Sequence, residues 1–457
     1  MVLLEPDLSI WQLQNLNKRG DGSARWSSTR PQHRPSRSMP KRQQDVQQGP
    51  PPFYKRFFSL CQRLLDHATV SANLVLNTHH QEPSPEANTV IIHERHQEPT
   101  TQPSPMTAFD IVVIGAGGGP DETNLSAYLV KSHPSRWEDG VLALEAGSGQ
   151  GALRHIVERN PRLFSSETEP GRALSATEVY NAIRCFLITH AHLDHINSLV
   201  VSAGSLSGPR KRIYAAKQTL DDIASIFNDR IWPNLASWKE DDENYKLLYS
   251  PLQQNTKYTS ITPDISVQSF PLNHGSNDHG PYESFAYFIR HDLSGGEFLF
   301  FGDVEPDSLA ATPQSIHVWR TAAPKIPTTL RAIFIECSWS SGRPDSQLFG
   351  HLTPEHLLEE LVVLATEVRK ARPSNHSSET HTRHTRKRQK RLVESYDVRG
   401  ALIGLTVYVM HCKDAPHDPK RAVPMREIIA EQVRALVEEK GLGCTILAAE
   451  QGMHIRI

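Results

Sequence analysis

Four side chains able to bind a metal ion lie close together in the chain, in the pattern H-x-H-x-D-H. The pattern directly follows residues 185–189, an almost uninterrupted apolar stretch that predicts a strand covered on both faces. His190 and His192 are two apart in an extended stretch, so they point to the same side and can share one ion. Asp194 and His195 turn into the next predicted helix and can reach a second ion. The spacing predicts a two-metal site; a surface histidine cluster at a helix start is the alternative.

This run resembles the metal motif of the metallo-β-lactamase fold, whose enzymes carry metals at strand ends between two β-sheets. The resemblance implies three further ligands, each after a candidate strand: His274, Asp303 and His411. One ion would be held by His190, His192 and His274, and the other by Asp194, His195 and His411. Asp303, with a water or hydroxide, would lie between them. Sites rich in histidine suit zinc, so the expected cofactors are two divalent ions, chiefly Zn2+, with manganese and iron left open.

The charge of such a centre favours a phosphate substrate. Two divalent ions exceed the negative charge of Asp194, Asp303 and a bridging hydroxide by one unit. A phosphodiester carries one negative charge and gains more as attack proceeds, so the centre would stabilise both binding and the transition state. The ions would also bring the pKa of bound water down to about 7. Asp194 is therefore expected to act in catalysis as well as in metal binding.

Phosphodiester cleavage also needs a proton for the departing oxygen, and we assign its delivery to His351. This residue lies just before a predicted helix, which Thr353 as N-cap and Pro354 at the first position mark. Glu336, which ends a candidate strand, could orient and charge the imidazole. In related phosphodiesterases of this fold, including tRNA 3′-processing nucleases, a His-x-Thr loop paired with an upstream Glu plays this part. The opposite division, with His351 as ligand and His411 as acid, stays open, as does a His351 that is only a polar neighbour of the cap.

Within the superfamily the chain more closely resembles the class II cyclic-nucleotide phosphodiesterases of fungi and some bacteria. The resemblance runs from about Phe109 to the C-terminus and rests on the metal motif and on residues 118–120, 124–129, 301–303 and 350–354. The chain departs from the pattern at residues 202–204 and at Glu145, where the fold usually places an Asp. The resemblance implies hydrolysis of the 3′ ester of 3′,5′-cyclic nucleotides, chiefly cAMP with cGMP as a further candidate, to 5′-monophosphates. Lower cAMP signalling would follow.

The elements that must position these residues have the texture of an α/β fold, in which short β-branched runs alternate with loops and helical patterns. With the resemblance, this predicts a metallo-β-lactamase-like αββα sandwich. Candidate strands lie at 111–115, 141–145, 185–189, 212–215, 266–271, 284–290, 298–302, 332–336 and 405–410. Helices are expected at 193–203, 217–227, 353–369 and 425–440.

Three regions differ in composition. Residues 1–105 are rich in Pro, Gln, Ser and Arg, and we expect a mostly disordered N-terminal extension that buries too little apolar surface to offset ordering entropy. Within it, residues 53–76 could form one amphipathic helix. Residues 106–457 form the expected phosphodiesterase domain, which a basic surface insertion at 372–391 interrupts. A solvated loop explains this insertion most simply, and nuclear localisation or nucleic-acid binding is the alternative.

Overall composition restricts the class of protein. With 49 Lys+Arg against 51 Asp+Glu, the 457-residue chain has a net charge of −2, so no global field favours nucleic acid or an acidic membrane. No apolar run approaches the roughly 20 residues of a spanning helix, and no secretory signal is evident. The five cysteines are scattered, which argues against a disulfide framework and a thiolate zinc site. We expect a cytoplasmic protein with a small-molecule substrate and no nucleic-acid or membrane partner. The sequence leaves the oligomeric state undecided, with a homodimer as one alternative.

Three other functions are alternatives to cyclic-nucleotide hydrolysis. An RNA phosphodiesterase of the tRNA 3′-processing type would use the basic insertion as a tRNA-binding arm. A dinucleotide-binding oxidoreductase would use Gly115 and Gly117 for a pyrophosphate and Glu145 for a ribose, but Pro120 stands where the motif needs its third glycine, and Asp121 would repel phosphate. A non-catalytic interaction protein has no need of the ordered set of metal-binding side chains.

Overall fold

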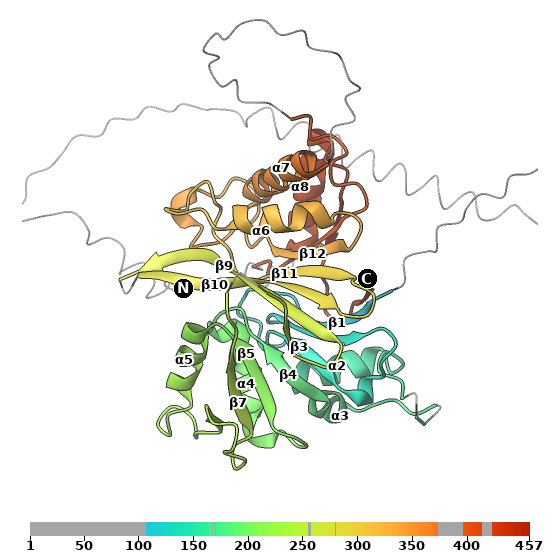
Figure 1. The fold of residues 1–457 in the computed structure, drawn as a ribbon, viewed down its shortest axis with the longest axis vertical. Helices are drawn as coiled ribbons and strands as arrows, with labels where there is room; N and C mark the ends of the chain where they lie inside the picture. Colours follow the sequence, from blue (N-terminus) through green and yellow to red (C-terminus); the bar gives the residue numbers. More distant parts are fainter. Residues whose placement is uncertain are drawn as a thin grey trace, which may run out of the picture. The chain divides into compact units, whose positions relative to one another are not determined.

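Two mixed β-sheets pack face to face in the computed structural model, which describes residues 107–166, 168–169, 171–254, 257–278, 280–372, 396–413 and 423–457 (Figure 1). Their facing sides share an apolar layer. In this layer the ring of Phe109 lies 5.0 Å from that of Phe298, and the ring of Tyr128 lies 5.2 Å from that of Phe300. The shared layer fixes how the two sheets pack on each other. It thereby also fixes the relative positions of the strand ends that carry the expected site.

The first sheet has the strand order β15-β1-β2-β3-β4-β5-β7-β6. It is antiparallel from β15 to β3 and parallel from β3 onwards. Its strands are β1 (Phe109–Gly115), β2 (Ala127–Ser132), β3 (Val141–Leu144), β4 (Ile183–Leu187), β5 (Lys211–Ala215), β6 (Ala236–Ser237), β7 (Leu247–Pro251) and β15 (His454–Arg456).

The second sheet has the order β14-β13-β12-β11-β10-β9-β8. A long antiparallel hairpin, β9 with β10, precedes four parallel strands. The strands are β8 (Thr259–Ser260), β9 (Ile265–Asn277), β10 (Gly280–His291), β11 (Glu297–Phe301), β12 (Leu330–Glu336), β13 (Thr406–Met410) and β14 (Thr445–Ala448).

Helices cover the outer side of each sheet, which completes four layers (Figure 1). The first sheet carries α2 (Gln150–Arg159), α3 (Ala176–Asn181), α4 (Leu193–Ser202) and α5 (Lys217–Ile226); the second carries α6 (Ser315–Ala322), α7 (Pro354–Ala371) and α8 (Met425–Lys440). Short 3₁₀ turns are η2 (Trp137–Asp139), η3 (Ala203–Ser205), η4 (Ala323–Lys325) and η5 (Asp345–Gln347). The expected α/β sandwich of the αββα type is confirmed.

Helix α7 illustrates how the sequence determines an element. Pro354 occupies its first turn, where the missing N–H costs nothing. Leu357, Leu361, Leu364 and Val368 then recur every three or four residues, and all are buried against the second sheet. The loop before the helix is thereby fixed, and it carries His351.

Most predicted elements exist with boundaries within a few residues, and the differences have local causes. Strand β4 ends before Thr189, because the backbone N–H of Thr189 donates to the Glu145 carboxylate instead of to a strand. The hairpin β9–β10 extends well beyond the two predicted strands. Sequence analysis missed β2, β6, β7, β8, β14, β15, α2, α3 and α6.

The topology removes the dinucleotide-binding alternative. That fold needs a strand, a helix and a second strand parallel to the first. Here β1 is followed by β2, which pairs with it in the antiparallel direction, and no helix lies between them. The glycines after β1 therefore do not open a helix toward a pyrophosphate.

Several predictions fall outside the described residues. These are the N-terminal extension at 1–105 with its candidate helix at 53–76, and nearly all of the basic insertion at 372–391. In the part of the chain that the structure describes, the helices are too short or too polar to cross a bilayer.

Candidate metal centre

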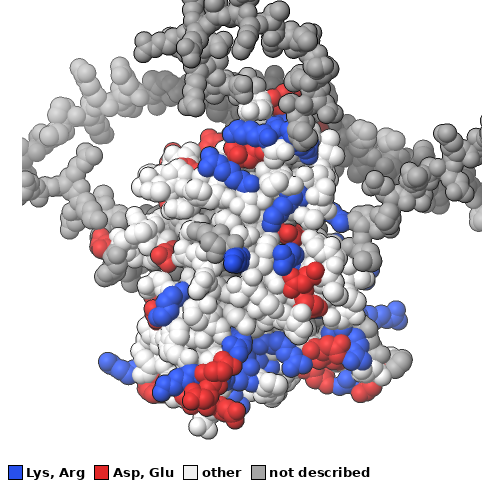
Figure 2. All heavy atoms as spheres, in the orientation of Figure 1, with Lys and Arg blue, Asp and Glu red and all other residues white. Residues whose placement is uncertain are grey.

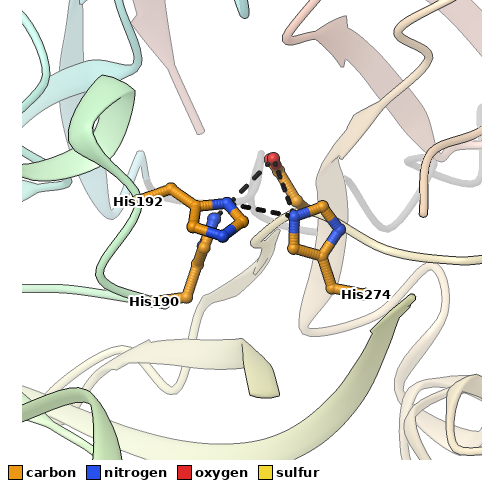
Figure 3. A group of neighbouring side chains, drawn as sticks. His190, His192 and His274 are labelled. Atoms are coloured by element: carbon orange, nitrogen blue, oxygen red, sulfur yellow. Dashed lines mark hydrogen bonds and ion pairs between the residues drawn. The ribbon is translucent and has the colours of Figure 1, made fainter. Parts of the chain in front are cut away.

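The seven expected ligands, from four segments of the chain, meet where strands of both sheets end, and His351 joins Asp303 and His411 in a further group of possible ligands. His190 and His192 lie in the loop that leaves β4, Asp194 and His195 in the first turn of α4, His274 in β9, Asp303 after β11, and His411 directly after β13. Figure 3 shows His190, His192 and His274 with their rings directed toward one another. Every ligand expected from the sequence lies in this cluster.

The first half of the cluster contains His190, His192 and His274 together with Asp303. The Nε2 atoms of His190 and His274 lie 3.7 and 3.6 Å from Oδ2 of Asp303. His274 Nε2 is also 3.3 Å from Nδ1 of His192. Zinc binds nitrogen at about 2.0–2.1 Å, so the ligand atoms of one ion lie roughly 3–4 Å apart. The observed spacing fits one ion.

The second half contains Asp194, His195 and His411. The Nε2 atoms of His195 and His411 lie 3.9 and 3.6 Å from Oδ2 of Asp194. Asp303 reaches this half as well, with Oδ1 3.3 Å from His195 Nε2 and Oδ2 3.1 Å from His411 Nε2. Asp303 therefore faces both groups, as a carboxylate between two ions must.

Outer hydrogen bonds orient three of the imidazoles. The pairs are His190 Nδ1 with Thr189 Oγ1 at 2.9 Å, His274 Nδ1 with the carbonyl oxygen of Gly350 at 2.9 Å, and His411 Nδ1 with Ser126 Oγ at 3.2 Å. Such partners fix the ring and its tautomer and leave Nε2 for a metal. These three hydrogen bonds thus fix the directions in which the Nε2 atoms of His190, His274 and His411 point.

Glu145 contacts His195, a member of the second half, and the loop after β4. It is 1% exposed, and its carboxylate accepts the backbone N–H of Thr189 at 3.2 Å. Its Oε1 lies 3.7 Å from Nδ1 of His195. Burial raises the pKa of Glu145. The glutamate that replaces the usual aspartate therefore still reaches both the loop after β4 and the imidazole.

The inner nitrogens fit bound cations. The Nε2 atoms of His190, His195 and His411 are buried and have no hydrogen-bond partner among the described residues. Buried polar atoms without a partner are rare and costly. All three are directed at a cluster that contains two aspartates, so cations between them would satisfy nitrogen and oxygen at once. The residues present therefore fit a divalent-metal site.

The pKa values follow the same logic. Burial lowers the pKa of His190 well below its usual range and that of His274 to about 3, which favours the neutral, metal-binding imidazole. Burial alone would raise the pKa of Asp303, but the charges of His411 and His195 hold it well below normal. Burial opposes the charge on His195, yet Asp303 and Asp194 raise its pKa well above normal. The two carboxylates thus create a strong preference for positive charge between them.

Backbone geometry next to the cluster leaves little freedom. Glu145 and His411 both have a positive φ, 57° and 56°, which non-glycine residues rarely adopt. Gly118 lies against the His411 ring so closely that a Cβ atom would overlap it. Such outliers concentrate at functional sites, where the surrounding structure enforces them.

His351 and Glu336 form a buried pair beside both halves. Nδ1 of His351 is 2.9 Å from Oε1 of Glu336, and the His351 ring lies 4.9 Å from that of His274 and 5.5 Å from that of His411. Glu336 also accepts the N–H of Val304 at 2.8 Å. Burial lowers the pKa of His351 to about 3, and burial with the nearby Asp303 charge raises that of Glu336 to about 7. Glu336 therefore pairs with Nδ1 of the imidazole, but the low pKa leaves His351 uncharged near neutral pH, which differs from the expectation that Glu336 would charge it.

Lys413 was not singled out from the sequence. Its Nζ donates to the carbonyl oxygen of Gly118 at 2.8 Å and lies 5.9 Å from the centre of the Trp339 ring. After burial and Asp303, the charge of Lys413 is the next influence on the pKa of both His351 and His411. Its position two residues after an expected ligand was the available signal.

Comparison with known proteins agrees with this geometry. A model of the class-II cAMP phosphodiesterases matches residues 160–452. The chain is similar to the 3′,5′-cyclic-nucleotide phosphodiesterase of Schizosaccharomyces pombe, at 30% identity over 76% of this chain and 93% of that protein. It is also similar to the enzyme of that name from Aliivibrio fischeri, at 30% identity over 76% and 92%. The crystal structure of unliganded yeast PDE1 superimposes with a TM-score of 0.60 at 27% identity, covering 76% of this chain and 99% of that one.

Two sheets between outer helices, with an imidazole and carboxylate cluster at their strand ends that fits divalent metal ions, define a hydrolase with an αββα sandwich fold. The family match covers more than half of the chain, and the S. pombe protein is matched over nearly its whole length. The chain belongs to the class-II cAMP phosphodiesterase family.

Proposed function

We propose that this chain hydrolyses 3′,5′-cyclic nucleotides, chiefly cAMP with cGMP as a second substrate, to 5′-nucleoside monophosphates, and so lowers cAMP signalling. Membership of the class-II family supports the reaction, because the relatives from S. pombe and A. fischeri are named as 3′,5′-cyclic-nucleotide phosphodiesterases. The observation that carries the proposal is the convergence of five histidines from three segments of the chain on Asp303.

The cofactors in this proposal are two zinc ions. His190, His192 and His274 would hold one, Asp194, His195 and His411 the other, and Asp303 would lie between them. Bound there, such ions would supply positive charge to the phosphate and a nucleophile from water at neutral pH. The buried, unpartnered nitrogens of the cluster support this ligand set.

The chain's own residues then have distinct tasks. The bond between phosphorus and the 3′ oxygen breaks, a bond from phosphorus to a hydroxyl oxygen forms, and the 3′ oxygen gains a proton. Burial raises the pKa of Glu336 to about 7, so its protonated carboxyl can donate to Nδ1 of His351 and leave the proton of the neutral imidazole on Nε2. Nε2 then gives that proton to the 3′ oxygen while Nδ1 takes the proton of Glu336, which becomes ionised. Lys413 adds a positive charge beside the cluster, where the phosphate becomes more negative as the reaction proceeds.

The RNA alternative has less support. On the face shown in Figure 2, Lys and Arg side chains are interspersed with Asp and Glu and form no extended basic track. Phosphate-tracking surfaces need such a local basic excess. The basic insertion that would form a tRNA-binding arm lies outside the described residues.

The near-neutral net charge of −2 supports a small-molecule substrate rather than a polyanionic partner.

The proposal also includes action in the cytoplasm and assembly as a homodimer. Fractionation of the native host cells would check the compartment, and light scattering of the purified chain would check the oligomeric state.

The test compares substrates. Purified full-length chain is incubated with cAMP, cGMP and a tRNA precursor, with and without a chelator, and products are separated by chromatography. We expect release of 5′-AMP from cAMP that the chelator abolishes and added zinc restores. Cleavage of the tRNA precursor with no turnover of either cyclic nucleotide would contradict the proposal.

A further inference from the structure

A second polar cavity lies outside the metal centre, at the corner of the first sheet where β15, β1 and β2 are neighbours. Its volume is about 460 Å³, and its lining comes from these three strands, from η2 and from the loop that follows α2. It shares no residue with the metal-binding cluster. Asp110, in β1, is one of its lining residues.

Asp110 is surrounded by an unusual number of cationic and imidazole groups. Its Oδ2 accepts Lys131 Nζ at 3.0 Å and lies 2.8 Å from His133 Nδ1. Its Oδ1 lies 2.7 Å from His454 Nε2 and accepts Arg456 Nε at 3.3 Å. Asp110 itself is 4% exposed. One buried carboxylate thus gathers four nitrogen-bearing side chains.

The cavity carries excess positive charge. Lys131, Arg162 and Arg456 line it, against Asp110 as its one carboxylate. The lysine and the two arginines exceed the one carboxylate by two positive charges. The side chain of Arg162 makes no hydrogen bond or ion pair with any residue that the structure describes. Arg456 is 64% exposed and uses only Nε on Asp110, so its terminal nitrogens are free to bind an anion.

Packing does not require this arrangement. In β1 the row that begins with Asp110 continues with Val112 and Ile114, both part of the apolar layer beneath the helices. On β2 the Lys131 side chain is 5% exposed, and its Nζ lies 5.3 Å from the centre of the Trp137 ring. Buried ion pairs often stabilise a fold no better than apolar residues of the same volume. Because packing of the core does not explain this buried group of charges, we infer that it serves to bind a ligand.

We propose that this cavity binds a small phosphate-bearing anion. Arginine recognises phosphate through paired N–H groups, and Arg162 and Arg456 supply two such forks at the edge of the cavity. Asp110 holds the cationic side chains in place, and Lys131, whose Nζ donates to Asp110 and to the carbonyl oxygens of Ser132 and His133, adds positive charge near the cavity without a free donor for the anion. The site is separate from the metal centre. Strand β1 carries Asp110 near one end and Gly115 at the other, about 17 Å away at the usual strand rise, and the next residue, Ala116, accepts the backbone N–H of His411.

Calorimetric titration of the full-length chain tests this site. Inorganic phosphate and 5′-AMP are the probes, each at constant ionic strength in a His192→Ala background that weakens binding at the metal centre. We expect binding of at least one probe, and an at least tenfold weaker affinity in the Arg162→Gln/Arg456→Gln double variant. The tighter probe tells whether the site takes a free phosphate or a nucleotide.

The control is Arg212→Gln/Arg290→Gln, which removes two arginines that do not line the cavity. It should leave the affinity unchanged, and both double variants should keep the melting temperature of the parent. Arg162→Lys/Arg456→Lys should recover part of the affinity. Equal affinities in the two glutamine variants, or no binding of either probe to the parent, would overturn the proposal.

Discussion

At the scale of single residues, the cluster owes its geometry to contacts on its outer side. Ser126, Thr189 and the Gly350 carbonyl each engage the Nδ1 atom of one histidine, so that Nε2 faces the aspartates. His190, His192, Asp194 and His195 could be predicted from their types and spacing, and the family resemblance added His274, Asp303 and His411. Their outer partners could not be predicted, because a serine 285 residues away in the chain from its histidine has no sequence pattern.

Replacement of His351 separates proton delivery from metal binding. We expect His351→Ala to keep the metal content of the wild type and to lower kcat for cAMP by about 10²–10⁴-fold, the usual contribution of a positioned acid. Metal analysis and steady-state kinetics on the same preparation measure both quantities.

His356→Ala is the matched control. His356 lies in the first turn of α7, where its Nδ1 pairs with Thr353 Oγ1 at 2.9 Å, and it is not part of the metal-binding cluster. Its replacement should change neither quantity. Loss of metal from His351→Ala would instead make His351 a ligand and reverse the roles assigned to it and His411.

Gly118→Ala probes the second half of the cluster. The new Cβ would overlap the His411 ring, which Ser126 holds in place, so the ring must move away from Asp194 and Asp303. We expect metal content to fall by about one equivalent and cAMP turnover to fall at least tenfold, with the circular dichroism spectrum unchanged. Gly151→Ala, at a position with nothing within 4 Å of the added atom, should leave both intact. Full metal content in Gly118→Ala would refute a role of His411 as ligand.

At the scale of elements, strong periodicity made the long helices predictable. The boundaries of α8 match the expected 425–440, and those of α7 differ by two residues at most. Strand β2 was missed because Lys131 and Ser132 read as a polar end, although Asp110 and the second sheet bury them. The three-residue strand β15 exists only through its pairing with β1, which no local propensity reveals.

Glu360 links α7 to α6 and gives stability a pH dependence. Its carboxylate accepts Trp319 Nε1 at 2.6 Å and the N–H of Asp307 at 2.8 Å, and burial raises its pKa to about 7. A raised carboxyl pKa means that the folded state binds this proton more tightly than the unfolded state, whose pKa is near 4.5. Its contribution to stability is therefore present below pH 4.5 and is lost as pH rises through 7, by at most about 3 kcal/mol.

The Glu360→Gln variant should flatten this dependence. Urea unfolding between pH 5 and 8 is expected to show that the wild type loses stability relative to Glu360→Gln as pH rises. Glu359→Gln, at an exposed neighbour on the same helix, should parallel the wild type. Parallel curves for the wild type and Glu360→Gln would show that this carboxyl does not titrate in that range.

At the scale of the whole molecule, the site exists because two sheets close on each other. Its ligands lie in four segments that span residues 190 to 411, and only the sandwich brings the ends of β4, β9, β11 and β13 together. Hydrophobic patterns predicted many of the strands but neither their order nor the C-terminal β15, which pairs with β1. The family resemblance, not periodicity, made the assembled site predictable. Lys413 and the cavity at Asp110 emerge only from the fold.

The proposed domain division makes a prediction for a shortened chain. Residues 107–457 contain both described sheets and every residue assigned to the reaction. We expect this fragment to hydrolyse cAMP with a kcat/KM within about threefold of the full chain and to unfold at a similar temperature. A fragment that is folded but inactive would assign a catalytic contribution to the first 106 residues.

Elemental analysis combined with 5′-AMP release on one preparation tests the central claim most directly. For the wild type we predict about two equivalents of divalent metal per chain, with turnover of cAMP that rises and falls with that content. His192→Ala, which removes a ligand of the first half, should lose metal and nearly all turnover while it stays folded. Undiminished release of 5′-AMP from metal-depleted wild type, or from His192→Ala, would contradict the account.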